Sequence, residues 1–74
     1  MVVEVRLFAG FREGRFKRQA MELPEGACLR DVLGRLAIPE KEVSLPLVNG
    51  RHSPFDRALA DDDVVALFPA IGGG

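Results

Sequence analysis

The sequence predicts an α+β domain in which a mixed sheet of four or five strands carries one main helix on one of its faces. Apolar and polar residues alternate over residues 2–8, as they do in a half-buried strand, and residues 64–68 near the other end of the chain form an apolar run of strand length. Between these stretches, leucine and valine recur over residues 29–36 at the spacing of a single helix face. A chain of 74 residues has room for only one domain, so these elements share one core.

Two strands and a turn precede the helix. In the first strand every second residue is apolar, and Glu4 and Arg6 lie on the opposite face. Residues 9–15 contain two glycines and predict a loop, while residues 16–23 predict a second, weaker strand. Proline and glycine within residues 23–26 then predict a tight turn.

The helix has the clearest pattern in the chain. Its apolar residues lie at positions i, i+3, i+4 and i+7 and form one stripe, which consists of Leu29, Val32, Leu33 and Leu36. Asp31 lies near the start, where a negative charge favours the positive end of the helix dipole. Gly34 costs about 1 kcal/mol relative to alanine inside a helix. Ile38 and Pro39 predict the end of the helix, because the residue before a proline disfavours helical geometry.

Three strands are predicted after the helix, at residues 43–48, 51–52 and 64–68, with irregular structure or a short helical turn at 53–59 and a turn at 61–63. Pro46 favours the edge of the sheet, because proline cannot donate a ladder hydrogen bond. Asn49 and Gly50 are typical of a type I′ hairpin turn, in which both central residues need a positive φ. Pro69 ends the last strand.

The order of these elements is typical of the β-grasp, or ubiquitin-like, fold. In this arrangement the first and last strands lie side by side and parallel in the middle of the sheet, and the helix covers one face. We therefore expect residues 1–69 to form the β-grasp domain and residues 70–74 to form a flexible C-terminal glycine tail.

Composition and charge argue against several classes of function. Ten basic residues against eleven acidic ones give a net charge of −1, whereas a nucleic-acid partner requires a basic surface. One cysteine and one histidine exclude an internal disulfide and a four-ligand Cys/His zinc site, so we expect no bound metal. The sequence shows no signal peptide and no apolar run of roughly 18 residues, so we expect a cytoplasmic protein without a membrane span. A chain this short rarely encloses a catalytic pocket, so we expect no catalysis by this chain alone.

The chain ends in Ala-Ile-Gly-Gly-Gly directly after the predicted last strand. Five extended residues reach about 17 Å, and Gly72, Gly73 and Gly74 have no side chains, so such a tail can thread a narrow channel. The carboxylate of Gly74 is a poor electrophile that becomes reactive as a mixed anhydride with AMP. We therefore predict that a partner enzyme supplies ATP and the catalytic residues, and that this protein binds no cofactor itself. A frayed tail without function is the alternative.

An apolar surface is predicted on the sheet face that the helix leaves uncovered. Exposed apolar patches mark interaction sites, and we predict that partner proteins dock here, with the tail as a second anchor. The residues assigned to this docking surface and its anchor are Phe8, Val64, Ala66, Phe68, Pro69 and Ile71. An error of one residue in the phase of the strands would move the outward side chains to the buried face.

Three further features have a structural explanation beside a functional one. Cys28 is either a reactive thiol or a small buried apolar residue, and the second interpretation is the more common. His52 follows a hairpin turn, and no nearby serine or aspartate completes a catalytic triad. Residues 61–63 are three consecutive aspartates, which favour a turn over a cation site.

Several short stretches occur in the order and spacing of one known family. They are Leu7-Phe8-Ala9 with Arg12-Glu13, Leu23-Pro24-Glu25-Gly26-Ala27 with Asp31-Val32-Leu33, Val48-Asn49-Gly50, Leu59 with Asp61 to Asp63, Ala66-Leu67-Phe68-Pro69, and Gly73-Gly74. Together they resemble the MoaD/ThiS family of ubiquitin-like sulfur carriers over essentially the whole chain. The Phe-Ala and Arg-Glu pairs resemble the small subunit of molybdopterin synthase more than the shorter thiazole-forming carriers. The chain departs from the family pattern at Cys28, Asp62 and Ala70, where the family often has a Ser or Thr cap, a glycine and a second proline.

The resemblance implies a cycle at Gly74. A ubiquitin-activating-type adenylyltransferase adenylates the carboxylate, and a sulfur donor such as a cysteine desulfurase or rhodanese converts it to a thiocarboxylate. The tail then enters the active site of the large subunit of molybdopterin synthase, or of another sulfur acceptor enzyme. There it delivers sulfur to the molybdenum or tungsten cofactor precursor.

Other functions remain open at this point. The acceptor could instead be the thiazole of thiamine, a transfer RNA base or another metabolite, because the chemistry at Gly74 would be the same. A ubiquitin-like protein modifier would join Gly74 to a lysine of a target. A non-catalytic β-grasp binding module would have no need of a free glycine end.

Overall fold

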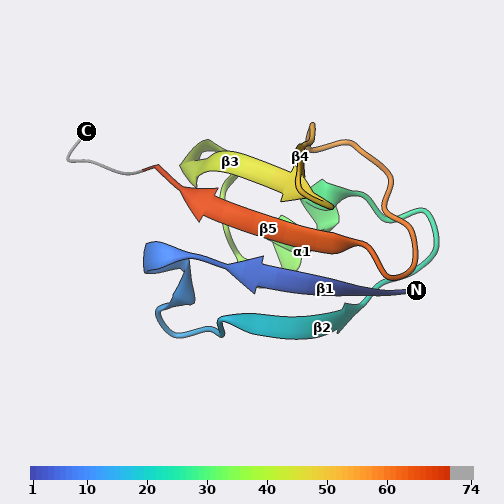
Figure 1. Cartoon of the computed structure of the whole chain (residues 1–74), viewed down its shortest axis with the longest axis horizontal. Coiled ribbons are helices and arrows are strands. Elements are labelled where there is room, and N and C mark those ends of the chain that lie inside the picture. The colour runs from blue at the N-terminus through green and yellow to red at the C-terminus, as the bar shows by residue number, and fades with distance from the viewer. Residues whose placement is uncertain (71–74) are drawn as a thin grey trace.

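A computed structural model describes residues 1–70 and shows a five-stranded mixed sheet with one α-helix packed on one face (Figure 1). The strands are β1 (Val2–Leu7), β2 (Arg18–Glu22), β3 (Val43–Val48), β4 (Arg51–His52) and β5 (Val64–Pro69), and the helix is α1 (Leu29–Leu36). The order in the sheet is β2-β1-β5-β3-β4. The central strands β1 and β5 are parallel, and the other neighbouring pairs are antiparallel. The predicted β-grasp fold is confirmed.

The core lies between the central strands and α1. Ten of its apolar side chains are at most 2 % exposed, and eight of these come from β1 (Val3, Val5, Leu7), β5 (Val65, Leu67) and α1 (Leu29, Val32, Leu33). Each such side chain contributes about 1.5–3 kcal/mol when it leaves water. The two parallel strands therefore form the most buried part of the sheet. The last of them, β5, leads directly to the C-terminal residues.

The segment predicted as a loop at residues 9–15 contains a 3₁₀ helix, η1 (Ala9–Arg12). The backbone N–H of Phe11 donates to the Phe8 carbonyl at 3.2 Å, and the Phe11 side chain is only 5 % exposed. Phe11 is thus a core residue that the sequence did not reveal, because a single helical turn is too short to show a period. A second 3₁₀ helix, η2 (Glu40–Glu42), precedes β3.

The helix ends earlier than Pro39, which was the predicted stop. Ala37 adopts the left-handed conformation with φ 56°, and the N–H of Ile38 donates to the Leu33 carbonyl at 3.0 Å. This is the usual geometry of a helix C-terminus, although glycine normally occupies the left-handed position. An alanine gives no sequence signal for such a stop.

The hairpin between β3 and β4 has the predicted turn, since Asn49 and Gly50 have φ values of 53° and 81°. The prediction that Pro46 marks an edge strand is wrong, because β4 lies outside β3. β4 pairs only with Leu47 and Val48, and the Pro46 carbonyl turns to the same side and accepts from Ser53. Proline has no backbone N–H, and the absent donor of Pro46 would point to the side of β3 beyond the short ladder with β4. No ladder hydrogen bond is therefore lost at Pro46.

Candidate functional site

Strand β5 positions the C-terminal residues. It is hydrogen-bonded to β1 on one side and to β3 on the other, and the N–H of Ala70 donates to the Glu42 carbonyl at 3.3 Å. The described chain ends there, so Ile71, Gly72, Gly73 and Gly74 lie outside the described residues. The last anchored residue lies beside the start of β3, at the end of the sheet where β1 also ends (Figure 1).

The two faces of β5 are those that the sequence predicts. Val65 and Leu67 are fully buried beneath α1, while Val64, Ala66 and Phe68 are half-exposed on the other face. The register pairs Glu4 with Val64 and Leu7 with Leu67, so Phe8 follows β1 at the level of Phe68. The phase of both strands is therefore as predicted, and the structure brings Phe8, Val64, Ala66 and Phe68 to one face.

Two aromatic rings are stacked at the end of this face nearest the tail. The rings of Phe8 and Phe68 have centroids 4.1 Å apart and an interplanar angle of 9°. The guanidinium carbon of Arg12 lies 5.1 Å from the centroid of the Phe8 ring, in the geometry of a cation–π contact. Arg12 is held there because its Nε donates to the Leu7 carbonyl at 2.6 Å. The stack is thus a pre-formed aromatic surface beside the exit of the chain.

Strand β3 extends this surface with two leucines that sequence reasoning missed. Leu45 pairs with Phe68 and Leu47 pairs with Ala66, so their side chains lie on the same face, and Leu45 is 40 % exposed. The register shifts between Val43 and Leu45. This bulge and the apolar Pro46 hide the alternation that would have revealed them.

We call this surface the open-face patch, and it consists of Phe8, Leu45, Leu47, Val64, Ala66 and Phe68. Pro69 is half-buried and pairs with Val43, so by strand alternation it points to the helix side. It borders the exit of the chain and does not belong to the patch.

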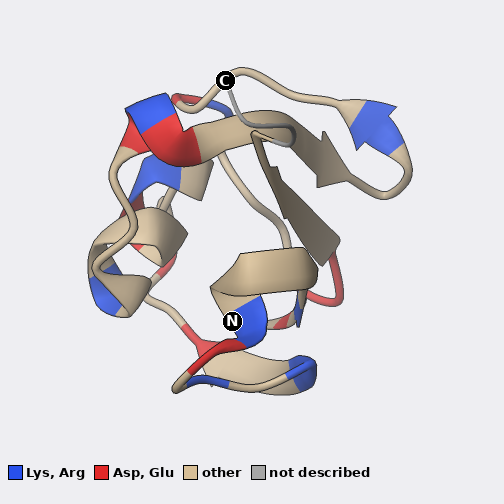
Figure 2. Ribbon diagram, turned by 90° about the vertical axis from the view of Figure 1, so that its left-hand side faces the viewer, with Lys and Arg blue, Asp and Glu red and all other residues tan. Residues whose placement is uncertain are grey.

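Charged side chains flank the patch on the β1 and β2 side. The carboxylate of Glu4 forms ion pairs with Arg6 on the same strand and with Arg18 of β2, the second at 3.9 Å. Elsewhere, acidic and basic residues are interspersed in the view of Figure 2. The exposed face of the sheet thus has an apolar half over β5 and β3 and a charged half over β1 and β2.

The three aspartates before β5 form a turn, as predicted. Asp61 accepts from the Val2 N–H at 2.7 Å, and Asp62 has a positive φ of 71°. The backbone N–H of Ala60 and the side-chain amide of Asn49 donate to the carboxylate of Asp63 and lower the pKa of that carboxyl group. This turn therefore holds the start of β5 to β1 and to the β3–β4 hairpin.

Asn49 completes this connection. Its backbone N–H donates to the Val64 carbonyl at 2.8 Å, and its side-chain oxygen accepts from the Val64 N–H at 2.9 Å. These hydrogen bonds are a second reason for an asparagine in the hairpin turn, in addition to its tolerance of a positive φ. They fix the position at which β5 begins.

Cys28 precedes α1 and is half-buried. The carboxylate of Asp31 accepts from the Cys28 backbone N–H at 2.8 Å, and this bond lowers the pKa of Asp31. The helix is therefore capped by Asp31 although a cysteine occupies the usual serine or threonine position. His52 is exposed on β4.

Residues 1–70 lack two other kinds of feature. No group of three or more His, Cys, Asp or Glu side chains in this part of the chain is arranged to hold a metal ion. None of its helices has the length and apolar character needed to cross a membrane.

Comparisons with known proteins agree with this geometry. A family model described as the ThiS family matches residues 5–74. No curated protein sequence gives a significant match. Among solved structures, the chain is similar to a putative molybdopterin converting factor, subunit 1, from Pyrococcus furiosus, with 33 % identity and a TM-score of 0.78. The match covers 96 % of this chain and 99 % of that one.

Two further structures are similar over the full length of both chains. One is in a protein–protein complex of subunits 1 and 2 of molybdopterin-converting factor from Helicobacter pylori, with 26 % identity and a TM-score of 0.66. The other is SAMP1 from Haloferax volcanii, with 24 % identity and a TM-score of 0.80, which supports the fold alone. The chain is thus a MoaD/ThiS-like protein of the ubiquitin fold, the class of sulfur carriers that its sequence resembles.

Proposed function

The chain belongs to the ThiS family, and on this premise we propose that it is a sulfur carrier whose Gly74 carboxylate becomes a thiocarboxylate. The sulfur serves the synthesis of a molybdenum or tungsten cofactor, with this chain as the small subunit of molybdopterin synthase. The observation that carries the proposal is a β-grasp domain whose central strand β5 leads within a few residues to Gly72, Gly73 and Gly74. The similarity to subunit 1 of a molybdopterin converting factor supports the choice of pathway.

The chemistry takes place on the terminal carboxylate. A carboxylate oxygen attacks the α-phosphorus of ATP on a ubiquitin-activating-type adenylyltransferase, which releases pyrophosphate and leaves an acyl adenylate. The outer sulfur of a persulfide on a cysteine desulfurase or a rhodanese then attacks the acyl carbon and displaces AMP. A thiol reduces the resulting acyl disulfide, which leaves the thiocarboxylate and a new disulfide between the two thiols. In the acceptor enzyme the thiocarboxylate sulfur attacks a carbon of the acceptor and forms a thioester that joins the two molecules. Hydrolysis of the acyl–sulfur bond then returns the original carboxylate and leaves the sulfur on the acceptor.

The protein's own contribution is delivery and recognition. Three glycines without side chains allow the terminus to enter a channel too narrow for other residues. The open-face patch lies beside the exit of β5, so a partner that binds the patch also receives the tail. In this scheme ATP and the catalytic side chains belong to the partner enzymes, and this chain binds no cofactor.

The same patch is the proposed contact for the large synthase subunit. The similar Helicobacter pylori structure is a complex of subunits 1 and 2, which supports a partner of that kind. Aromatic residues that a partner buries are typical of the residues that dominate binding energy. The Phe8–Phe68 stack is therefore the expected anchor of the complex.

Intact mass spectrometry tests the carrier function directly. The full chain is incubated with ATP, a matching activating enzyme and a sulfur source. We expect a mass gain equal to the replacement of one oxygen by sulfur, located at Gly74 by fragmentation. A chain extended by one residue after Gly74 is expected to show no gain. Gly34→Ala, a glycine change outside the tail and the patch, is the matched control and is expected to react like the wild type.

The acceptor is tested in a second experiment. The thiocarboxylated protein is mixed with the large subunit of molybdopterin synthase and its pterin precursor, and formation of the dithiolene is measured. A product here supports the molybdopterin pathway, whereas transfer only to a thiazole precursor or a transfer RNA assigns another acceptor. Conjugates with cellular proteins on a gel, without thiocarboxylate formation, would contradict the carrier function and favour a protein modifier.

A further inference from the structure

Strand β2 is an edge of the sheet and presents an open row of backbone groups. It pairs with β1 on one side only. The Lys17 carbonyl accepts from Leu7, and the Leu23 N–H donates to Met1, so the odd-numbered residues of β2 turn their backbone groups to β1. The N–H and C=O groups of Arg18, Ala20 and Glu22 therefore point outward from the sheet.

This edge lacks a proline and a bulge, two of the features that usually prevent pairing with another strand, and its charged side chains are Arg18 and Glu22 at the two ends. The register with β1 is regular through all five residues. Among residues 1–70, the one side chain that bonds to its outer backbone groups is Arg35, whose guanidinium donates to the Glu22 carbonyl at 3.3 Å. An edge of this kind is a template for a further strand.

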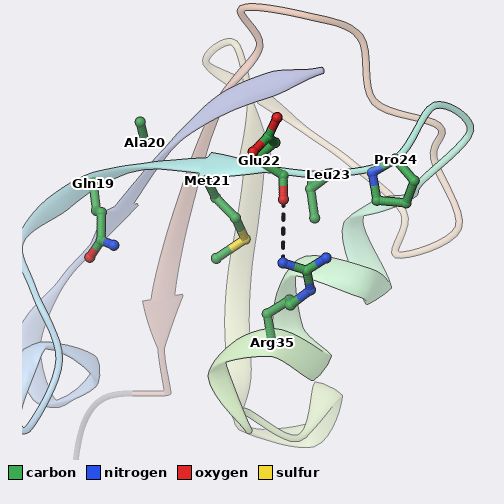
Figure 3. A pocket seen from close by; sticks show the side chains of 7 residues that line it. All are labelled: Gln19, Ala20, Met21, Glu22, Leu23, Pro24 and Arg35. Carbon is green, nitrogen blue, oxygen red and sulfur yellow. Dashed lines mark hydrogen bonds between the residues drawn. The ribbon is translucent and has the colours of Figure 1, made fainter.

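A groove lies alongside the edge, on the side of the helix. It is open, has a volume of about 640 Å³, and is lined by residues 19–24 and by Arg35 of α1. Figure 3 shows Met21 and Leu23 directed toward the helix, while Ala20 and Glu22 point away from it. A strand added to β2 would place alternate side chains in this groove.

The charges along β2 indicate which strand could pair with its free edge. The sequence of β2 is Arg-Gln-Ala-Met-Glu, with a cation at one end, an anion at the other and alanine in the centre. In an antiparallel pair of two such strands centred on Ala20, Arg18 of each copy faces Glu22 of the other on the open face of the sheet. Opposite charges in facing positions stabilise an antiparallel pair.

We propose that β2 is a self-association edge, through which two copies of this chain form an antiparallel β2–β2 dimer with one continuous sheet. Ala20 faces Ala20 at the two-fold axis, and Arg18 faces Glu22 on either side of it. These are the residues with outward backbone groups, so each facing pair exchanges both of its hydrogen bonds. The Glu22 carbonyl keeps its bond from Arg35, because a carbonyl oxygen has two lone pairs.

The dimer leaves the proposed carrier site free. β2 is separated from β5 by β1, and the open-face patch and the exit of the chain lie over β5 and β3. One strand pair and one groove make a small interface, of the class below about 1,200 Å² that gives transient association. We therefore expect a reversible, concentration-dependent dimer that carries two accessible tails.

Charge reversal with rescue tests the arrangement. Sedimentation equilibrium is measured on the full-length wild type and on Arg18→Glu, Glu22→Arg and the double variant that combines both changes. Each single change places like charges opposite one another at two symmetry-related positions, so we expect dimerisation to weaken about tenfold. The double variant restores opposite pairs and is expected to dimerise like the wild type. Circular dichroism confirms that all four proteins are folded.

Amide exchange measured by NMR locates the interface. In the proposed dimer the amides of Arg18, Ala20 and Glu22 become protected as the protein concentration rises. The amides of Gln19 and Met21, which face β1, are expected to be protected at every concentration. Protection that rises with concentration at residues 18, 20 and 22 but not at 19 and 21 identifies the β2 edge as the interface. An interface elsewhere would leave the exchange of the three outward amides independent of concentration.

Three results would overturn the proposal. One is a wild type that stays monomeric up to millimolar concentration, and another is a dimer whose double variant is no stronger than either single variant. The third is protection of the three outward amides only when an extended acidic peptide is added to a protein that stays monomeric. That last result would make β2 an acceptor for a partner peptide. None of these outcomes affects the thiocarboxylate experiment, so the two proposals can fail separately.

Discussion

Replacing Phe68 by alanine removes half of the aromatic stack at one end of the open-face patch, and its two effects can be separated. Phe68 is half-exposed and stacks on Phe8 with centroids 4.1 Å apart. Stacked aromatic pairs contribute about 0.5–1.5 kcal/mol beyond their buried area. A half-buried phenylalanine loses less than the 3–5 kcal/mol typical of core positions, so we expect the free energy of unfolding to fall by about 2 kcal/mol.

The effect on binding is expected to be larger than this loss of stability explains. An aromatic anchor at the centre of an interface costs at least about 2 kcal/mol when it is truncated, which corresponds to a Kd increase of about 30-fold. The matched control is Val2→Ala. Val2 is 43 % exposed and lies on the same sheet face, outside the patch. A change at such a surface position is expected to stay within about 0.5 kcal/mol for stability and to leave binding unchanged.

Two assays measure these quantities. Urea unfolding of the wild type, Phe8→Ala, Phe68→Ala and the double variant gives the coupling between the rings, which we expect to be about 0.5–1.5 kcal/mol. Calorimetric titration with the large subunit of molybdopterin synthase gives the Kd of each folded variant. If Phe68→Ala and Val2→Ala bind with the same affinity as the wild type, the open-face patch is not the docking surface.

Three further predictions concern the stability of the domain. Gly34 lies inside α1, and an added Cβ meets no atom within 4 Å, so Gly34→Ala is expected to raise the free energy of urea unfolding by about 0.5–1 kcal/mol. Ala37 has φ 56°, so Ala37→Gly relieves the left-handed strain and is expected to stabilise by about 0.5–1 kcal/mol in the same assay, whereas destabilisation would contradict the observed helix end. The pKa of Asp63 is lowered in the folded state, so its contribution to stability is present above the usual aspartate pKa of about 3.9 and is lost as the pH falls through the lowered value. Asp63→Asn is therefore expected to flatten the decline of the unfolding free energy in acid, and a variant whose stability declines as steeply as that of the wild type would contradict this assignment.

The central part of the fold could be predicted because its elements have a clear period. The alternation in the sequence of β1 and the stripe of α1 each mark a face that the fold buries, and a wrong phase would place valines and leucines in water. In the uniformly apolar β5, strand geometry still directs alternate side chains to opposite faces. The same alternation predicted the positions of Phe8 and Phe68, which the structure stacks against each other. The positions of Phe8 and Phe68 could be predicted because the residues next to them must be buried, and a strand then directs Phe8 and Phe68 to the opposite face.

The remaining elements depend on local geometry that leaves no period. The bulge between Val43 and Leu45 shifts the faces of β3, so Leu45 and Leu47 could not be assigned to the patch. Phe11 is buried by a 3₁₀ turn of four residues within a stretch that reads as a loop. The outward backbone groups of β2 follow from the register with β1, which the sequence of β2 alone does not contain.

The structure constrains how far a partner's catalytic atoms can lie from the surface that it binds. β5 is held on both sides by its neighbours and at its start by Asn49 and Asp63, so Phe68 is fixed relative to the core. Gly74 is the sixth residue after Phe68, and six fully extended residue steps reach about 20 Å. Any enzyme that acts on the Gly74 carboxylate while it binds the open-face patch must therefore hold its reacting atoms within that distance of the patch. Two enzymes that share the patch must also bind this protein in turn, since one patch and one tail cannot serve both at once.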